Sequence, residues 1–211
     1  CYFIEKAETN FANLEEILAR EAPGIQNSER IEVDIKNADF AGFVGELLGT
    51  AQTGSTFIPS FFFIDPFGFT GIPFSTVAKI LSNPKTEIFF TFMVRDIARF
   101  IQLPEQEANF NGLFGTDKWK AILASSDKTE VALIDLYREQ LHEVAKVRYS
   151  WAFRVCASEK LQTLYYLLHA TNNHKGHAIM KDIMFNQSAN ADFAYLGPQD
   201  VAAKSQMRLF E

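Results

Sequence analysis

The chain has 211 residues, of which 47% are hydrophobic, and a formal net charge of −6. This length suits one globular domain whose core needs no disulfide or metal for stability. The acidic balance argues against a uniformly basic nucleic-acid binder, and no run approaches the roughly 18 apolar residues of a membrane span.

Four short apolar runs, rich in aromatic and β-branched residues, predict strands buried on both faces. They are Tyr2–Ile4, Ile31–Ile35, Phe61–Ile64 and Ile88–Met93. Stretches of helical periodicity separate them: a first helix ends at Pro23-Gly24, a second covers about Ala41–Leu48, and a third begins at Pro73. This alternation predicts a parallel sheet with right-handed crossovers.

Residues 96–147 predict a helical insertion, with segments near Asp96–Gln102, Glu105–Phe114, Thr116–Leu123 and Glu130–Val147. Strand patterns return at Tyr149–Cys156 and Leu161–Ala170. The link between them is too short for a crossover helix, so these two strands should be antiparallel neighbours. A last helix, about Lys175–Asn186, precedes a polar tail over residues 187–211 that we expect to be partly disordered.

The predicted fold class is α/β, with a Rossmann-like, mostly parallel sheet and one antiparallel strand in a domain over residues 1–186. A closing antiparallel pair is typical of class I methyltransferases and not of nucleotide dehydrogenases. Because Cys1–Ile4 already reads as a buried strand, we expect upstream residues and a missing first strand. Cys1 and Cys156 lack disulfide or zinc-ligand spacing, which indicates free thiols and a cytoplasmic location.

Charge is distributed unevenly along the chain. Residues 1–50 have a net charge of −6, whereas residues 141–181 have a net charge of +4 and contain all four histidines. A polyanion, if one binds, is expected on the second segment. The alternative is a modest fluctuation on a solvated face.

Polar residues that directly follow parallel strands are the first candidates for a site, because ligands bind beyond the carboxyl ends of such strands. Glu5 could accept hydrogen bonds from both hydroxyls of a ribose, or it could be an exposed acid at a helix start. Asp39 could accept from an adenine amine while Phe40 packs on the ring, or it could cap the next helix.

The run Phe61-Phe62-Phe63-Ile64-Asp65-Pro66-Phe67-Gly68 is the sharpest signal. A carboxylate after a buried strand, followed by a proline and a glycine, predicts a rigid loop. Asp65 could accept from a planar amine, with Phe67 or Phe69 as a stacking face; the alternative is an ordinary Asp-Pro turn. We expect Asp65 to share a cavity with Glu5 and Asp39.

A polar run, Thr171-Asn172-Asn173-His174-Lys175-Gly176, closes the last long strand. His174 and Lys175 could contact a phosphate with the help of the helix N-terminus, or the run could be a capping turn. Together with His169 and His177, His174 forms no convincing metal site, so we assign no metal ligand. Trp119 and Trp151 are expected in the core.

Two resemblances extend this interpretation. Asp65-Pro66-Phe67 resembles the Asp-Pro-Pro-Tyr/Phe motif of amino-methyltransferases, although Phe67 replaces the second proline and Gly68 the aromatic residue. Five runs in order resemble the bacterial three-Cys-motif partner family: Phe3-Ile4-Glu5-Lys6, Phe62-Phe63-Ile64-Asp65-Pro66-Phe67-Gly68, Gly71-Ile72-Pro73-Phe74, Leu113-Phe114-Gly115-Thr116-Asp117-Lys118-Trp119 and Ala170-Thr171-Asn172-Asn173-His174-Lys175-Gly176.

The second resemblance implies a methyltransferase-like fold that uses S-adenosylmethionine, with Glu5 and Lys6 on the cofactor side. It also implies a partner with a three-cysteine motif of the radical-S-adenosylmethionine type. The main methionine-binding loop would lie upstream and is absent from this chain.

Three functions follow from these observations as hypotheses. The first is N-methylation of a nucleic-acid base, with Asp65, Pro66 and Phe67 around the amine. The second is a non-catalytic scaffold or partner-binding module that keeps the fold. The third, weaker one is a nuclease-like component of phage defence, in which Asp34, Asp39 and Asp65 converge on a metal.

Overall fold

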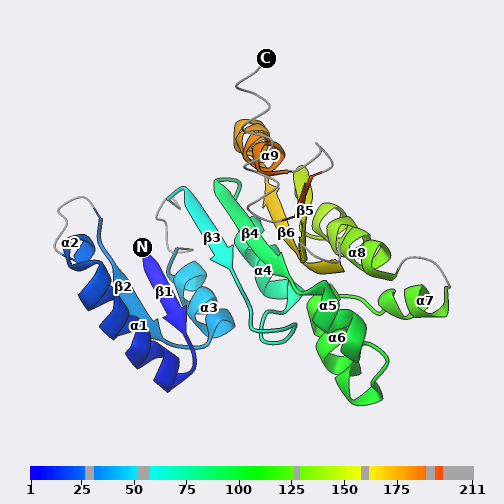
Figure 1. The fold of residues 1–211 in the computed structure, drawn as a ribbon, viewed down its shortest axis with the longest axis horizontal. Coiled ribbons are helices and arrows are strands. Elements are labelled where there is room, and N and C mark those ends of the chain that lie inside the picture. Colours follow the sequence, from blue (N-terminus) through cyan, green and yellow to red (C-terminus); the bar gives the residue numbers. More distant parts are fainter. Residues whose placement is uncertain (27–30, 52–57, 126–128, 158–161, 189–192, 197–211) are drawn as a thin grey trace. The chain divides into compact units, whose positions relative to one another are not determined.

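The structure, a computed structural model, describes residues 1–26, 31–51, 58–125, 129–157, 162–188 and 193–196. The chain divides into two compact units, Cys1–Ser55 and Thr56–Glu211, and both contain helices and strands (Figure 1). The α/β class is therefore confirmed, while a single domain over residues 1–186 stays a prediction. None of the described helices is long and apolar enough to cross a membrane.

The first unit is built on a two-stranded parallel sheet. Strand β1 (Tyr2–Glu5) pairs with β2 (Asp34–Asn37), and Glu5 lies opposite Asn37 at the carboxyl end of both strands. Between them lie α1 (Glu8–Glu21) and α2 (Pro23–Gln26), and α3 (Phe40–Ala51) follows β2. The predicted strand-helix-strand order is confirmed here.

The second unit contains a five-stranded sheet in the order β3-β4-β6-β5-β7. The strands are β3 (Ser60–Ile64), β4 (Thr86–Phe92), β5 (Tyr149–Ala157), β6 (Gln162–Thr171) and β7 (Ala194–Tyr195). Strand β6 lies between β4 and β5 and is antiparallel to both, whereas β3–β4 and β5–β7 are parallel pairs. The mostly parallel sheet with one reversed strand is therefore confirmed.

All elements described between β4 and β5 are helical, so the predicted helical insertion is confirmed. They are α5 (Val94–Phe100), η1 (Pro104–Gln106), α6 (Glu107–Phe114), α7 (Trp119–Ala124) and α8 (Thr129–Glu143). Helix α8 was predicted to reach Val147 but ends at Glu143. Lys146 has a φ of 58°, which is outside the range of a right-handed helix.

Helices cover both faces of the five-stranded sheet. Even-numbered side chains of β4 pack on α8 and on α4 (Phe74–Leu81), with Phe90 stacked on Tyr137 at 5.5 Å between ring centroids. Residues Phe89, Trp151 and His169 are in register on the other face, against α9 (His174–Gln187). This gives the three layers expected of an α/β sheet.

The structure corrects the expectation that all four early strands are buried on both faces. Only β4 is, since it lies inside the sheet and helices cover both faces there. Strand β3 is at the edge of its sheet, and Phe61 and Phe63 are 56% and 59% exposed. Strand β1 has β2 as its one described neighbour, and Tyr2 is 54% exposed.

One helix start differs from the prediction, and one short strand was not predicted. Pro73 is the extended residue before α4 and not its first helical residue, because its ψ of 146° lies outside the helical range. The polar tail from residue 187 contains β7, which pairs with β5 and buries Ala194 to 2% exposure. A two-residue strand leaves too short a pattern to detect.

Candidate functional site

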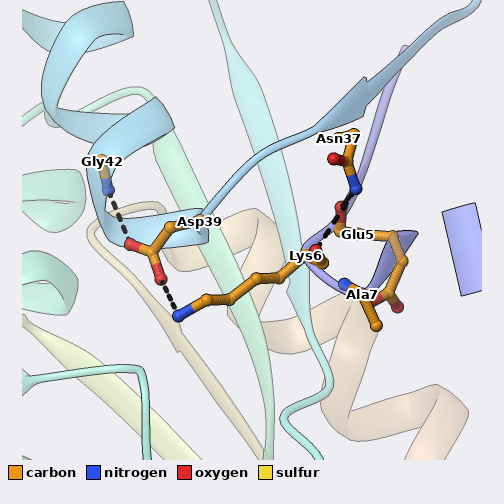
Figure 2. Close-up of polar contacts among 6 residues, drawn as sticks. All are labelled: Glu5, Lys6, Ala7, Asn37, Asp39 and Gly42. Atoms are coloured by element: carbon orange, nitrogen blue, oxygen red, sulfur yellow. Dashed lines mark hydrogen bonds and ion pairs between the residues drawn. The ribbon is translucent and has the colours of Figure 1, made fainter. Parts of the chain in front are cut away.

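The carboxyl end of β1 and β2 is held together by the side chain of Asn37 (Figure 2). Its amide nitrogen Nδ2 donates to the carbonyl oxygens of Glu5, at 3.1 Å, and of Lys6, at 3.2 Å. The backbone of Ala38 adds a third hydrogen bond to the Glu5 carbonyl. The turn after β1 is therefore fixed by β2, which holds the Glu5 side chain at this edge of the small sheet.

Glu5 itself is half-buried and directed at the start of α1. Its Oε1 accepts a hydrogen bond of 2.7 Å from the backbone nitrogen of Ala7 (Figure 2). No hydrogen bond involves Oε2 within the described residues. Both alternatives for Glu5 thus keep support: one oxygen caps a helix start, and the other remains an acceptor for a hydroxyl.

Asp39 caps α3, which was one of the two roles predicted for it. Oδ2 accepts from the backbone nitrogen of Gly42 at 3.1 Å, and Oδ1 lies 3.4 Å from Nζ of Lys6 (Figure 2). The hydrogen bond from Gly42, aided by Lys6, lowers the pKa of Asp39. Because Lys6 is 77% exposed, this ion pair is weak and a ligand amine could replace the ammonium. Phe40 follows as the half-buried first residue of α3.

Asp65 lies directly after β3, at the carboxyl end of the parallel strands of the second unit. It is exposed, and its side chain makes no hydrogen bond or ion pair with the described part of the chain. The loop then turns at Gly68, whose φ of 94° favours glycine. Asp65 therefore follows a strand as predicted, and its role as an acceptor for an amine stays a prediction.

The aromatic residues of this loop have different surroundings. Phe69 stacks on Phe110 at 4.6 Å and contacts Phe100 at 5.8 Å, so the helical insertion holds its ring. Phe67 is fully exposed. Of the two stacking faces proposed from sequence, Phe67 is the one open to a ligand, while Phe69 anchors the loop.

His174 and Lys175 lie at the opposite edge of the five-stranded sheet from Asp65. Strand β6 runs against β4, so its end at Thr171 lies beside Glu87, near the start of β4. The side chain of Asn173 accepts from the backbone nitrogens of Lys175 and Gly176 at 2.9 and 3.1 Å. The capping turn is therefore present, and it occupies two of the amides that a phosphate would use.

A buried pair that the sequence did not predict lies beside this turn. His169 is fully buried, and its Nε2 lies 3.0 Å from Oε2 of Glu87. The same carboxylate packs on the first turn of α9, where a Cβ added at Gly176 would lie 2.9 Å from its Cδ. The sequence did hold a signal for this pair: Glu87 is a single acid within an apolar strand, and a buried acid requires a partner.

An aromatic stack continues from this pair along α9. The His177 ring lies 6.3 Å from that of His169 and stacks on Tyr149 at 5.2 Å. Burial lowers the pKa of both histidines; for His177, the neighbouring His169, Lys181, His174 and Arg138 lower it further, whereas Glu87 partly opposes the change for His169. Both imidazoles therefore take up a proton less readily in the folded protein than an ordinary histidine does.

Folding stability should consequently fall in mildly acidic solution. Histidine has an ordinary pKa of 6.5, so below that pH the unfolded chain binds protons that the folded protein does not. Stability from this stack should be complete above about pH 6.5 and decline as the pH falls toward the lowered folded values. Urea unfolding of the protein at pH 7.5 and 5.5 measures the difference.

His177→Phe is the matched variant for this test, because it keeps an aromatic ring against Tyr149 and cannot ionise. We expect its stability to change less between the two pH values than that of the wild type. Equal changes in both proteins would contradict a role for His177 and leave His169 as the remaining candidate.

The structure thus brings Glu5, Lys6 and Asp39 together in the first unit, and keeps Asp65–Phe67 and His174-Lys175 at opposite edges in the second. A cavity shared by Asp65 with Glu5 and Asp39 stays a prediction. Among the described residues, no group of three or more His, Cys, Asp or Glu side chains could hold a metal ion. No protein-family model, curated protein or solved structure matches the chain.

Proposed function

We propose that this protein is a cytoplasmic, methyltransferase-like protein of the Rossmann type that methylates an exocyclic nitrogen of a nucleic-acid base. The observation that carries the proposal is the position of β6, reversed and inserted between β4 and β5. This is the arrangement by which a class I methyltransferase sheet differs from an all-parallel dehydrogenase sheet. The resemblance of the five sequence runs supports the same assignment.

Asp65 and Phe67 are the residues proposed to receive the base. Asp65 offers a carboxylate without a competing partner among the described residues, and Phe67 offers an unobstructed ring two residues later. Pro66 restricts the backbone between them, and Gly68 permits the turn that follows, with a φ of 94°. A planar amine can therefore donate to Asp65 while its ring stacks on Phe67, a contact worth about 1–3 kcal/mol per base.

The residues of the first unit are suited to hold S-adenosylmethionine, which supplies an activated methyl group when bound. The free Oε2 of Glu5 could accept from a ribose hydroxyl, and Oδ1 of Asp39 could exchange Lys6 for an adenine amine. Neither residue is needed for proton transfer. Their contribution is to bind and orient, which is most of what such a reaction asks of a protein.

The unpaired outer edge of β3 fits the first strand that the resemblance implies. In the described part of the chain β3 pairs with β4 alone, and its exposed Phe61 and Phe63 leave an apolar surface beside that edge. Exposed edges of this kind are normally covered or paired. A further parallel strand on this edge, with the methionine-binding loop after it, completes the proposed domain.

A second candidate is a non-catalytic module that acts only with a three-Cys-motif partner. It is favoured by the contacts that both Asp39 oxygens already make, one with Gly42 and one with Lys6, because a ligand amine would have to compete with them. In this case the exposed Phe67 would contact the partner and not a base.

Asp65→Asn separates the two candidates. The amide keeps the shape of the side chain but loses the negative charge that orients an amine, so methyl transfer should fall about tenfold to a hundredfold. The measurement is transfer of a radiolabelled methyl group from S-adenosylmethionine to mixed DNA and RNA, by protein that includes the proposed upstream methionine-binding loop and with the partner protein present. Asp182→Asn on α9, also exposed, is the matched control and should retain activity.

Equal activity of Asp65→Asn and wild type would remove Asp65 from the mechanism. Absence of activity in both proteins, with partner and substrates present, would favour the module that acts without catalysis.

A further inference from the structure

The amino-terminal edge of the five-stranded sheet gathers cations that are distant in sequence. Glu87 of β4, Thr171 of β6 and Tyr149 of β5 are in register across three neighbouring strands. The side chains that precede β4 and β5 and those that follow β6 therefore lie together at one end of these three strands. Four of them are exposed and positively charged: Lys85, Lys146, Arg148 and Lys175, which we call the basic edge.

Hydrogen bonds fix the loops that carry these side chains. The backbone nitrogen of Arg148 donates to Oδ1 of Asn172 at 3.0 Å, which joins the loop before β5 to the loop after β6. The Lys85 carbonyl accepts from the Ser60 nitrogen at 3.1 Å. Strands are about 4.8 Å apart, so the ends of β4, β6 and β5 present the charges over roughly 10 Å.

The acidic side chains near the basic edge do not neutralise its positive charge. No ion pair forms between a basic-edge side chain and any other residue that the structure describes. Glu87 is directed at His169, and Glu143 at the end of α8 lies 3.7 Å from Lys118. The basic edge thus stays positive in a chain whose net charge is −6, which makes it a local attractor for a polyanion.

Aromatic rings beside these cations favour a nucleic acid over an acidic peptide. Tyr149 begins β5 next to Arg148, and its ring meets the exposed His174 edge-on at 5.6 Å. Bases of an unpaired strand stack on such rings and on the planar guanidinium of arginine, whereas carboxylates gain only from charge. Stacked bases also require single strands, because duplex bases already stack on one another.

We infer that the basic edge is a docking surface for the phosphate backbone of single-stranded DNA or RNA. The basic edge and Asp65 lie at opposite ends of the strands of the sheet. The inference therefore does not depend on methyl transfer and concerns a second contact with the nucleic acid. Lys85, Lys146, Arg148 and Lys175 bind phosphates, while the exposed ring of His174, held edge-on against Tyr149, offers a face to a base.

The test is fluorescence anisotropy of labelled 20-nucleotide oligo(dT) and oligo(U) with the whole protein at 50 and 200 mM salt. The variant Lys146→Glu/Arg148→Glu/Lys175→Glu should bind at least tenfold more weakly than wild type. Its plot of log affinity against log salt should also be shallower by about 2, since each lost phosphate contact in a single strand removes about 0.7. The two oligonucleotides distinguish DNA from RNA as the ligand.

The matched control is Arg95→Glu/Arg99→Glu/Lys120→Glu, which makes the same charge change on α5 and α7. It should bind much as wild type does. Three results would each overturn the inference. The wild type could fail to bind either oligonucleotide at 50 mM salt, or the two triple variants could lose the same affinity. Polyglutamate could also displace the labelled oligonucleotide as well as an unlabelled oligonucleotide does. All six side chains are exposed, and circular dichroism checks that both variants stay folded.

Discussion

Gly115→Ala should lower the free energy of unfolding of the second unit by about 2–5 kcal/mol. Gly115 ends α6 in the left-handed region, with a φ of 67°, and its nitrogen donates to the Asn111 carbonyl. Any other residue there costs about 1–2 kcal/mol of backbone strain. An added Cβ would also lie 2.8 Å from Cδ1 and 3.1 Å from Cβ of Phe74, which is buried, and such overpacking costs about 1–3 kcal/mol.

Urea unfolding followed by tryptophan fluorescence measures this loss in the right part of the chain, because both tryptophans, Trp119 and Trp151, lie in the second unit. Gly112→Ala is the matched control: it lies within α6 and has nothing within 4 Å of an added Cβ, so it should stabilise by up to about 1 kcal/mol.

A double variant separates the two causes. Phe74→Ala removes Cγ and Cδ1 of Phe74 and leaves only its Cβ near the new methyl group, so in that background Gly115→Ala should cost mainly the backbone strain. An equal cost in both backgrounds would mean that Phe74 does not limit this position.

The order and direction of the long strands could be predicted because they depend on local information. A link as short as Ser158-Glu159-Lys160 permits only an antiparallel neighbour, and helical periodicity alone marks residues 96–147. Burial was predicted less well. Phe61 and Phe63 form the same kind of apolar run as Phe90 and Phe92, yet β3 is an edge strand and β4 is not. Position within a sheet is a long-range property that an apolar run does not encode.

The candidate site shows the same division. That Asp65 follows a strand was predictable from the run before it, but the separate surroundings of Phe67 and Phe69 depend on Phe100 and Phe110, which lie far along the chain. The Glu87–His169 pair joins residues 82 positions apart. Sequence could mark each as unusual in an apolar strand, but only the register of β4 against β6 brings them together.

The contribution of the helical insertion to the stability of the sheet can be measured at Tyr137. Its fully buried ring on α8 lies within 5.1–5.6 Å of the rings of Phe74, Phe90 and Phe92, which belong to α4 and β4. Tyr137→Ala removes these contacts and leaves a cavity, so it should cost about 3–5 kcal/mol. A loss below about 1 kcal/mol would mean that α8 packs too loosely to stabilise the sheet.

Tyr137→Phe should have the opposite effect. The Tyr137 hydroxyl is buried with no hydrogen-bonding partner among the described residues, and burial raises its pKa far above the ordinary value. An unpartnered buried polar group costs about 1–3 kcal/mol, so removing this oxygen while keeping the ring should raise the free energy of unfolding by about 1 kcal/mol. Tyr165→Phe, on the half-exposed part of β6, is the control and should change stability by less than about 0.5 kcal/mol. Destabilisation by Tyr137→Phe would instead indicate that the hydroxyl makes a hydrogen bond in solution, and would contradict a dry, fully apolar contact between α8 and β4.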